Sequence, residues 1–528
     1  MNKQLYLLPL LFILFSCGQD FSDEKLSIFK YNEVAGINSL DPAFAKDQAS
    51  IWACSQLFNG LVQLNDSLLV KPSIAKSWQV DDNGSRYTFT LRDDVLFHEN
   101  KLFTNINQRR VSAYDFEYSF ARLIDPKLAS PGAWVMSNVK TFKAINDSVF
   151  LMELHKPFPP FLGLLSMPYC SVVPQEIIDQ DVFDEQPVGT GPFRFQYWKQ
   201  NVKLVYRKNS DYFEKGLPYL DAVAITFIKD KQTAFLEFLK GNLDFISGID
   251  ASYKDEVLDK EGRLQEKYND KIKFYSLPYL NTEYLGFLMD SSNMSLSNQL
   301  KIRKAINYGF DRNKMIRFLR NNVGTPATKG FIPEGLPSFT ETLNGYDYNP
   351  ELARKLIQDC QLEQDHNIVL STTSSYLDIC EFIQNQLGQL GLNIEVSINP
   401  PSTHRQMVAT SKLDFFRGSW IADYGDGENY LALFYSKNHS PNGPNYTHFS
   451  SKKYDLLYEK SLLDKSIIER HALYNEMDQI IIDNAAIVPL YYDRVLRFVQ
   501  NDIVGFQGNA MNMLNLKSVS RTSQMIPK

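Results

Sequence analysis

The stretch that decides the fold class runs from Ile368 to Ile398 and reads IVLSTTSSYLDICEFIQNQLGQLGLNIEVSI. It begins as an apolar strand, continues as an amphipathic helix, and after Gly391 ends in a strand with alternating apolar residues. The apolar face of the helix is formed by Cys380, Ile383, Leu387 and Leu390. A strand, a helix and a second strand in this order form a βαβ unit. We therefore predict an α/β fold with a parallel sheet and with ligands at the strand ends.

A loop at one such strand end is the candidate ligand site. The run from Leu413 to Trp420 fits the next strand of this sheet, and it leads into the segment 417–430, RGSWIADYGDGENY. This loop should place Trp420 and Asp423 at the mouth of the sheet. A carboxylate beside an aromatic face suits a positively charged ligand, because both groups attract an ammonium. The alternative is a solvated acidic turn.

Length and charge limit the class of protein. A chain of 528 residues is too long for one core and should divide into two or three domains. Its 44% hydrophobic and 22% charged residues are typical of a soluble globular protein. The net charge of −6 and the lack of a basic run argue against nucleic acid as a partner.

The N-terminus indicates export and lipidation. After Lys3, the apolar run from Leu5 to Phe15 is too short to span a bilayer and has the proportions of a signal-peptide core. The ending Leu-Phe-Ser-Cys17 resembles the bacterial lipobox, in which the cysteine is lipidated and becomes the mature N-terminus. We expect residues 1–17 to be a lipoprotein signal peptide and 18–27 a tether, so that the mature chain is anchored rather than spanning. The alternative is a plain secretory signal in which Cys17 is incidental.

The other cysteines and the histidines give no metal pattern. Cys54, Cys170, Cys360 and Cys380 lie far apart, without a Cys-x-x-Cys and without neighbouring histidines. Buried thiols are the default expectation. Cys360 and Cys380 are the pair to test for a disulfide, since an exported protein can oxidise. The seven histidines are scattered, so we expect neither a metal nor a cofactor.

A strand-rich subdomain is predicted over residues 65–185. The segment 78–91 is a hairpin with an Asn83-Gly84 turn, and its second strand alternates apolar residues. A helix from Ser112 to Ile124 has a capping box with Asp115. A second hairpin joins 140–145 to 149–154.

After Tyr279 helices and strands alternate. We predict helices over 300–310, 312–319, 350–357, 450–463 and 467–484. The runs Ile487–Tyr492 and Leu496–Val499 are predicted as two strands that return to the first domain. The chain has neither an internal repeat nor a low-complexity tract.

Several segments in this order resemble the peptide-type solute-binding proteins of bacterial ABC importers, a family that includes dipeptide- and oligopeptide-binding proteins. The matching motifs are LDPA (40–43), IAKSWQV (74–80), VLFH (95–98), VSAYDF (111–116), GTGPF (189–193), IRKAINYGFDR (302–312) and WIADY (420–424). They span roughly residues 30 to 500. The sequence departs from the family at Glu99-Asn100, where relatives have Asp-Gly, and the connection to Arg110 is longer.

The resemblance implies a two-lobed periplasmic-binding-protein-like α/β fold, of the large cluster-C type, with an extra strand-rich subdomain in the first lobe. Lobe I would comprise 28–64, 186–278 and 487–528, with the subdomain at 65–185. Lobe II would comprise 279–486.

The resemblance also implies a function. The protein would be a monomeric lipoprotein of the cell envelope, held to the membrane by its lipid anchor. It would capture a peptide between its lobes as an added strand and deliver it to an ABC permease and its ATPase.

Site residues follow from the matched motifs. The Asp of Trp-x-x-Asp holds the ligand ammonium in relatives, and it maps onto Asp423, flanked by Trp420 and Tyr424. Arg417 matches an arginine that can meet the carboxylate of a short peptide. The backbone of Gly189, Thr190 and Gly191 could bond the ligand; the alternative is a turn without ligand contact. The site's other acids, Asp426 and Glu428, are expected to be surface loop acids.

The three alternative functions are an enzyme, the same fold with another cargo, and a ligand-presenting sensor. An enzyme is disfavoured because the chain has no Gly-x-Ser-x-Gly, no His-Glu-x-x-His and no phosphate loop. A calcium loop from Asp423 fails because its twelfth residue is Phe434. The same fold could carry an oligosaccharide, a nickel chelate, an opine or another amine, although few histidines argue against nickel. A ligand-presenting sensor is the third alternative.

Overall fold

The computed structural model describes residues 26–104, 109–180, 183, 186–250, 253–290, 295–363, 366–464 and 466–522. Cys17 and the predicted signal peptide lie outside the described residues, as does the predicted tether up to residue 25.

The predicted βαβ unit is confirmed. It consists of β14 (Ile368–Thr372), α10 (Leu377–Gly388) and β15 (Ile394–Ile398). The two strands are parallel, in register from Ile368 opposite Ile394 to Thr372 opposite Ile398. The α10 residues that pack on the sheet are Ile379, Cys380, Ile383 and Leu387.

These strands belong to an 11-stranded mixed sheet of order β15-β14-β16-β12-β17-β11-β1-β10-β9-β8, with β13 paired to β17. The α/β prediction is therefore right, although many neighbours are antiparallel. The other strands are β16 (Phe415–Ile421), β12 (Ile272–Phe287), β17 (Ile487–Gln500), β11 (Phe245–Ser247), β1 (Ile28–Asn32), β10 (Ala222–Thr226), β9 (Lys203–Lys208), β8 (Phe193–Lys199) and β13 (Thr325–Pro326).

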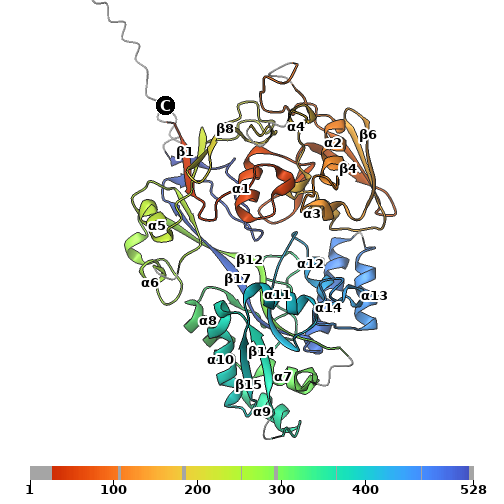
Figure 1. Ribbon diagram of the computed structural model, residues 1–528, viewed down its shortest axis with the longest axis vertical. Coiled ribbons are helices and arrows are strands. Elements are labelled where there is room, and N and C mark those ends of the chain that lie inside the picture. The colour runs from red at the N-terminus through yellow and green to blue at the C-terminus, as the bar shows by residue number, and fades with distance from the viewer. Residues whose placement is uncertain are drawn as a thin grey trace, which may run out of the picture.

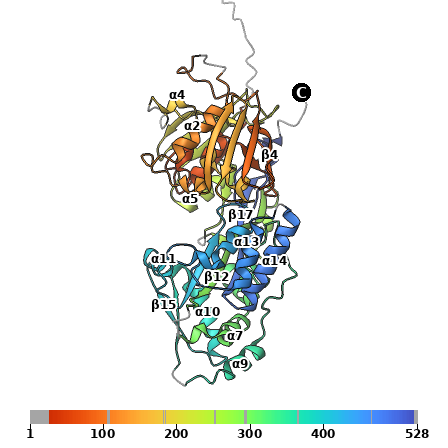
Figure 2. The ribbon, with the colours of Figure 1, turned by 90° about the vertical axis from the view of Figure 1, so that its right-hand side faces the viewer.

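The molecule has two lobes joined by the long strands β12 and β17 (Figure 1). Lobe I, at the top, contains α1 (Gln48–Leu57), α2 (Ala113–Leu123), α3 (Phe161–Leu164) and α4 (Gln175–Ile178). Lobe II, below, contains α7 (Leu300–Tyr308), α8 (Arg312–Arg320), α9 (Pro350–Gln358), α10, α11 (Pro401–Ala409), α12 (Glu428–Leu431), α13 (Lys452–Ser461) and α14 (Ile467–Asp483). Turned by 90°, the view shows α13 and α14 in front of lobe II, below the sheet of lobe I (Figure 2).

One strand that crosses between the lobes, β17, differs from the prediction. The two strands expected at 487–492 and 496–499 are one continuous strand, β17, which begins in the core of lobe II at Ile487 and Val488. Its partner β12 carries a bulge between Pro278 and Thr282, opposite Tyr492 to Arg494 of β17. On the lobe I side, α5 (Lys231–Leu239) and α6 (Lys254–Val257) pack against Leu496 and the start of β12.

Lobe I contains a separate sheet of order β4-β5-β7-β6. Its strands are β4 (Ala75–Val80), β5 (Arg86–Leu91), β7 (Val149–Leu154) and β6 (Val139–Asn146), so both predicted hairpins are confirmed. Tyr87, Phe89 and Leu91 are buried on one face, as their alternation predicts. The short strands are β2 (Val62–Leu64), β3 (Val70–Pro72), β18 (Ile503–Val504) and β19 (Ser520–Arg521).

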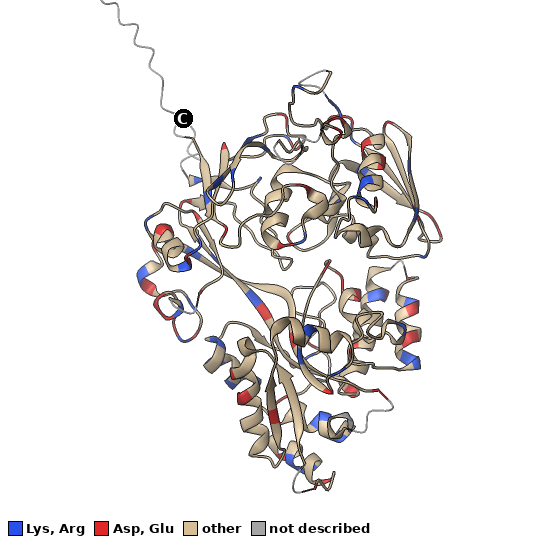
Figure 3. Ribbon diagram, viewed as in Figure 1, with Lys and Arg blue, Asp and Glu red and all other residues tan. Residues whose placement is uncertain are grey.

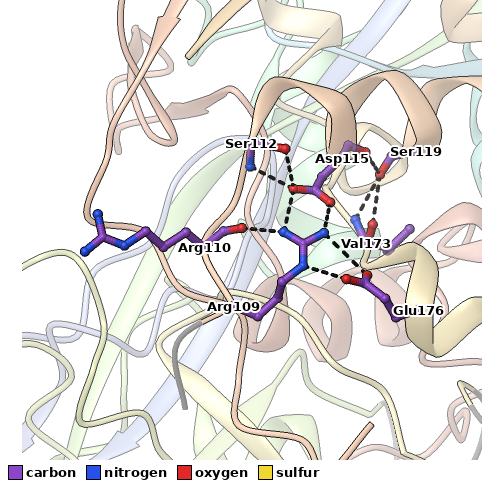
Figure 4. A network of polar contacts seen from close by, with 7 residues as sticks. All are labelled: Arg109, Arg110, Ser112, Asp115, Ser119, Val173 and Glu176. Carbon is purple, nitrogen blue, oxygen red and sulfur yellow. Dashed lines mark hydrogen bonds and ion pairs between the residues drawn. The ribbon is translucent and has the colours of Figure 1, made fainter. Parts of the chain in front are cut away.

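A polar network fixes the start of α2 (Figure 4). Asp115 accepts the backbone N–H of Ser112 at 2.7 Å in the predicted capping box, and Arg109 donates to both of its oxygens. Arg109 also reaches Glu176 on α4, at 2.6 Å. Ser119 accepts the N–H of Val173 at 3.0 Å. The network therefore ties α2 to the segment 173–176.

The cysteines among the described residues form no disulfide. Cys54, Cys170, Cys360 and Cys380 are free thiols, so Cys360 and Cys380 are not joined by a disulfide. No helix among the described residues is long and apolar enough to cross a membrane. Acidic and basic residues are interspersed over both lobes (Figure 3).

Candidate ligand-binding site

The loop that carries Asp423 begins at the end of β16, where one edge of this strand is open. β16 pairs with β12 along its whole length, from Phe415 to Ile421. On its other side, the ladder to β14 consists of Phe416 opposite Ser371 within the part of the chain that the structure describes. The backbone of 418–421 therefore offers an edge for another strand, and Asp423 follows directly after it.

A cavity of about 410 Å³ lies between the lobes at this point. From lobe I, α1 lines it with Gln48, Ile51 and Ser55, which the helical period places on one face. From lobe II, the loop 421–424 lines it. Its remaining walls include the apolar side chains of Trp134, Met167, Met511 and Met513. The volume is in the range of small-ligand sites.

Asp423 is exposed toward this space and makes no ion pair with any residue that the structure describes. Its carboxylate accepts a hydrogen bond from Asn429 Nδ2 at 3.3 Å. Surrounding protein atoms raise the pKa of Asp423, and the bond from Asn429 partly opposes this. The tyrosine facing it from lobe I, Tyr169, has a pKa raised by burial and then by the charge of Asp423. The arrangement is an unpaired carboxylate between two lobes.

Asn429, which the sequence did not single out, organises the predicted residues. Its Oδ1 accepts the backbone N–H of Asp423 at 3.1 Å and the indole N–H of Trp420 at 2.9 Å. Trp420 is half-buried. Asn429 is 6% exposed, and because it contacts both residues it holds Trp420 and Asp423 together.

Tyr424 faces lobe I. Its ring packs edge-on against Phe158 of lobe I, with centroids 6.2 Å apart, and its hydroxyl donates to Glu428. A second contact between the lobes is made by Leu68 of lobe I, which packs among buried apolar side chains of lobe II. The expectation that Glu428 is a surface acid is wrong, because this side chain is 3% exposed. Asp426 is half-buried and lies 3.5 Å from Arg470.

Arg417 is already paired within lobe II. It forms an ion pair with the buried Glu283, and its guanidinium lies 3.2 Å from the ring centroid of Tyr376. It is not among the residues that line the cavity. Its charge is therefore neutralised in this structure, and the predicted contact with a ligand carboxylate would require Glu283 to release it. The sequence did not predict this ion pair because Glu283 lies 134 residues before Arg417.

The segment Gly189-Thr190-Gly191 is buried in lobe I and is not among the residues that line the cavity. Gly189 O accepts the N–H of His98 at 2.7 Å, and Gly191 N donates to Leu57 O at 2.8 Å. A Cβ on Gly189 would lie 2.1 Å from Leu57 O, so close packing requires glycine. Thr190 Oγ1 donates to Asn59 at 3.1 Å. These bonds favour the alternative reading of the segment, a turn without ligand contact.

Comparison with known proteins identifies the family. Residues 70–442 match the model for bacterial extracellular solute-binding proteins, family 5 Middle. The chain is 25% identical to heme-binding protein A of Haemophilus influenzae over 476 residues, which are 85% of this chain and 84% of the relative. It is 24% identical to the dipeptide-binding protein DppE of Bacillus subtilis over 516 residues, 91% and 89% of the two chains.

The fold matches as well. The unliganded open form of the periplasmic murein tripeptide binding protein MppA superposes with a TM-score of 0.82 at 22% identity, covering 94% of this chain and 98% of the other. The two lobes, the large mixed sheet and the family match agree with one another. The chain belongs to family 5 of the bacterial extracellular solute-binding proteins, the binding components of ABC importers.

Proposed function

We propose that this protein captures peptides in the cavity between its lobes and delivers them to an ABC permease. The observation that carries the proposal is the unpaired carboxylate of Asp423 at the end of the open edge of β16. A peptide added to this edge would bond through its backbone and place its ammonium at Asp423. The apolar walls formed by Ile51 and the methionines suit peptide side chains.

The site's electrostatics favour an amine. As the lobes close, water leaves and the local dielectric falls, so a carboxylate facing an ammonium contributes more than it would in water. Trp420 and Tyr424 would flank the bound amine as part of the same loop. We further propose that the chain is anchored through a lipid on Cys17, and that other cargo of the family, such as an opine or a nickel chelate, is the alternative occupant.

The first experiment is native mass spectrometry on the protein without residues 1–17, purified without denaturation. Peptide-sized masses that dissociate on activation are the expected result. A single non-peptide mass would keep the family assignment and change the cargo.

Calorimetry with the peptides so identified then tests the anchor. Asp423→Asn should weaken binding at least tenfold, which corresponds to about 1.4 kcal/mol, because a desolvated charge pair is lost. Asp347→Asn, an exposed position of lobe II, is the matched control and should bind as the wild type does. Equal affinities for Asp423→Asn and wild type would remove Asp423 as the amine anchor.

A further inference from the structure

Behind the candidate ligand anchor lies a buried carboxyl group that the proposed function does not use. Glu428, the first residue of α12, is 3% exposed and has no basic side chain within ion-pair distance among the described residues. Each of its oxygens accepts a hydrogen bond from a phenol: Oε2 from Tyr424 and Oε1 from Tyr458 on α13. Burying a carboxyl group is costly, and hydrogen bonds offset only part of the cost.

One hydrogen-bond partner of Glu428, Tyr424, and the next residue in the chain, Asn429, both connect Glu428 to the candidate site. Tyr424 follows Asp423 in the chain and packs against Phe158 of lobe I. Asn429 holds the carboxylate and the backbone N–H of Asp423. The ring that contacts the other lobe and the amide that orients Asp423 are therefore both set by the conformation of the segment 424–429.

We propose that Glu428 is a positioning residue, which acts through Tyr424 and Tyr458 to hold the loop of Asp423 in its ligand-binding conformation and which makes ligand capture sensitive to pH. The proposal rests on the proposed role of Asp423 as the amine anchor. Glu428 itself is not among the residues that line the cavity.

The direction of the pH effect follows from the surroundings. Burial raises the pKa of Glu428 to about 7; the two phenols lower it and the charge of Asp426 raises it. Other groups packed around Glu428 and its two phenols are Tyr454 on α13 and Arg470 and Tyr474 on α14, and the ring of His471 packs against Tyr474. In a solvated, opened loop the carboxyl group would ionise near its ordinary pKa of 4.5. The folded loop therefore holds a proton that the opened loop loses, and raising the pH toward 8 favours opening.

The first test needs no ligand. Amide hydrogen exchange of peptides covering 418–431 is followed at pH 6 and pH 8, corrected for the intrinsic rate. In the wild type, protection should fall by about tenfold from pH 6 to pH 8, because the opening equilibrium rises about tenfold per pH unit up to the folded-state pKa of about 7 and levels off above it. Glu428→Gln, which stays neutral, should remove the pH dependence. Tyr458→Phe should lower protection at both pH values.

Two controls separate this role from general destabilisation. Tyr454→Phe removes another buried hydroxyl of α13, one bonded to Leu431 O, and should leave the pH dependence unchanged. His471→Gln removes the nearby group that titrates in the same range and should also leave it unchanged. If Glu428→Gln keeps the wild-type pH dependence, or if His471→Gln abolishes it, the proposal is wrong.

The second test uses a tripeptide library, with bound masses counted by native mass spectrometry at pH 6 and pH 8. Wild-type occupancy should fall at pH 8, and Glu428→Gln should be occupied equally at both pH values. Binding that depends on Asp423 but shows the same pH profile in wild type and Glu428→Gln would overturn this inference and leave the proposed function standing. A library that does not bind the wild type would overturn the proposed function, and hydrogen exchange alone would then decide the role of Glu428.

Discussion

At the scale of single residues, two buried carboxyl groups of lobe II, Glu428 and Asp478, are held by neutral donors instead of cations. Glu428 is held by two phenols, and Asp478 accepts backbone N–H groups from Phe331 and Ile332 at 2.8 to 3.1 Å. Neither has a cationic partner among the residues that the structure describes. Both groups are therefore protonated at a higher pH than surface carboxyl groups are.

Asp478 makes stability depend on pH. Burial raises its pKa from 3.8 to about 7, so the folded state retains a proton that the unfolded chain loses. Its contribution is fully present below about pH 4 and is lost as the pH rises toward 7, on the order of 4 kcal/mol in the free energy of unfolding. We expect the stability of wild type relative to Asp478→Asn to fall between pH 4 and pH 7 in urea titrations. A constant difference across this range would show that Asp478 ionises normally.

Residue identity at the site was partly predictable. Asp423 was predicted as a ligand residue because a Trp-x-x-Asp motif follows a strand, and strand ends are where this class of fold binds ligands; its contact with a ligand stays a prediction. The burial of Glu428 was not predictable, because it depends on Tyr458, thirty residues later on another helix. The same holds for Arg417, whose partner Glu283 lies on β12, 134 residues away in sequence. Pairing across the fold decides which charges remain free.

At the scale of elements, capping signals predicted helix starts well. Ser112 with Asp115 starts α2, and Asp311 accepts the N–H of Lys314 at the start of α8. β17 was mistaken for two strands because Asp493 and Arg494 interrupt its apolar pattern. These residues lie where the strand passes between the lobes, so they are half-buried while the strand continues through them. Apolar periodicity reports burial, and here burial changes within one strand.

The polar network at the start of α2 should stabilise lobe I, and none of its residues lines the cavity. Asp115→Ala removes the capping box and leaves Glu176 as the ion-pair partner of Arg109 among the described residues. We expect a loss of about 2 to 4 kcal/mol in the free energy of unfolding, combining a lost cap with a broken, largely buried ion pair. Asp125→Ala, at an exposed position in the turn just after α2, is the control and should change this free energy by less than about 0.5 kcal/mol. Equal stabilities of the two variants would contradict this account, and ligand affinity should be unchanged in both.

At the scale of the whole molecule, the two lobes are joined by strands and also pack against each other. β12 and β17 join them on one side, where the bulge after Pro278 interrupts the ladder. On the other side, Tyr424 packs against Phe158, and Leu68 packs into lobe II. The cavity at Asp423 lies between lobes that are joined by two strands, and two strands permit bending where their ladder is broken.

Bending at this crossing predicts closure on binding. A ligand held by Asp423 on one lobe and by α1 on the other binds a closed state better than an open one, and this difference in affinity is what shifts the population. Small-angle X-ray scattering should therefore show a smaller radius of gyration when the tripeptide library, or the peptides found by mass spectrometry, saturate the protein. Asp423→Asn at the same peptide concentration should keep the larger radius and should contract only when the concentration is raised in proportion to its weaker affinity. A saturated protein with an unchanged radius would mean that peptides bind without lobe movement, and the contact between Tyr424 and Phe158 would then already define the ligand-bound arrangement.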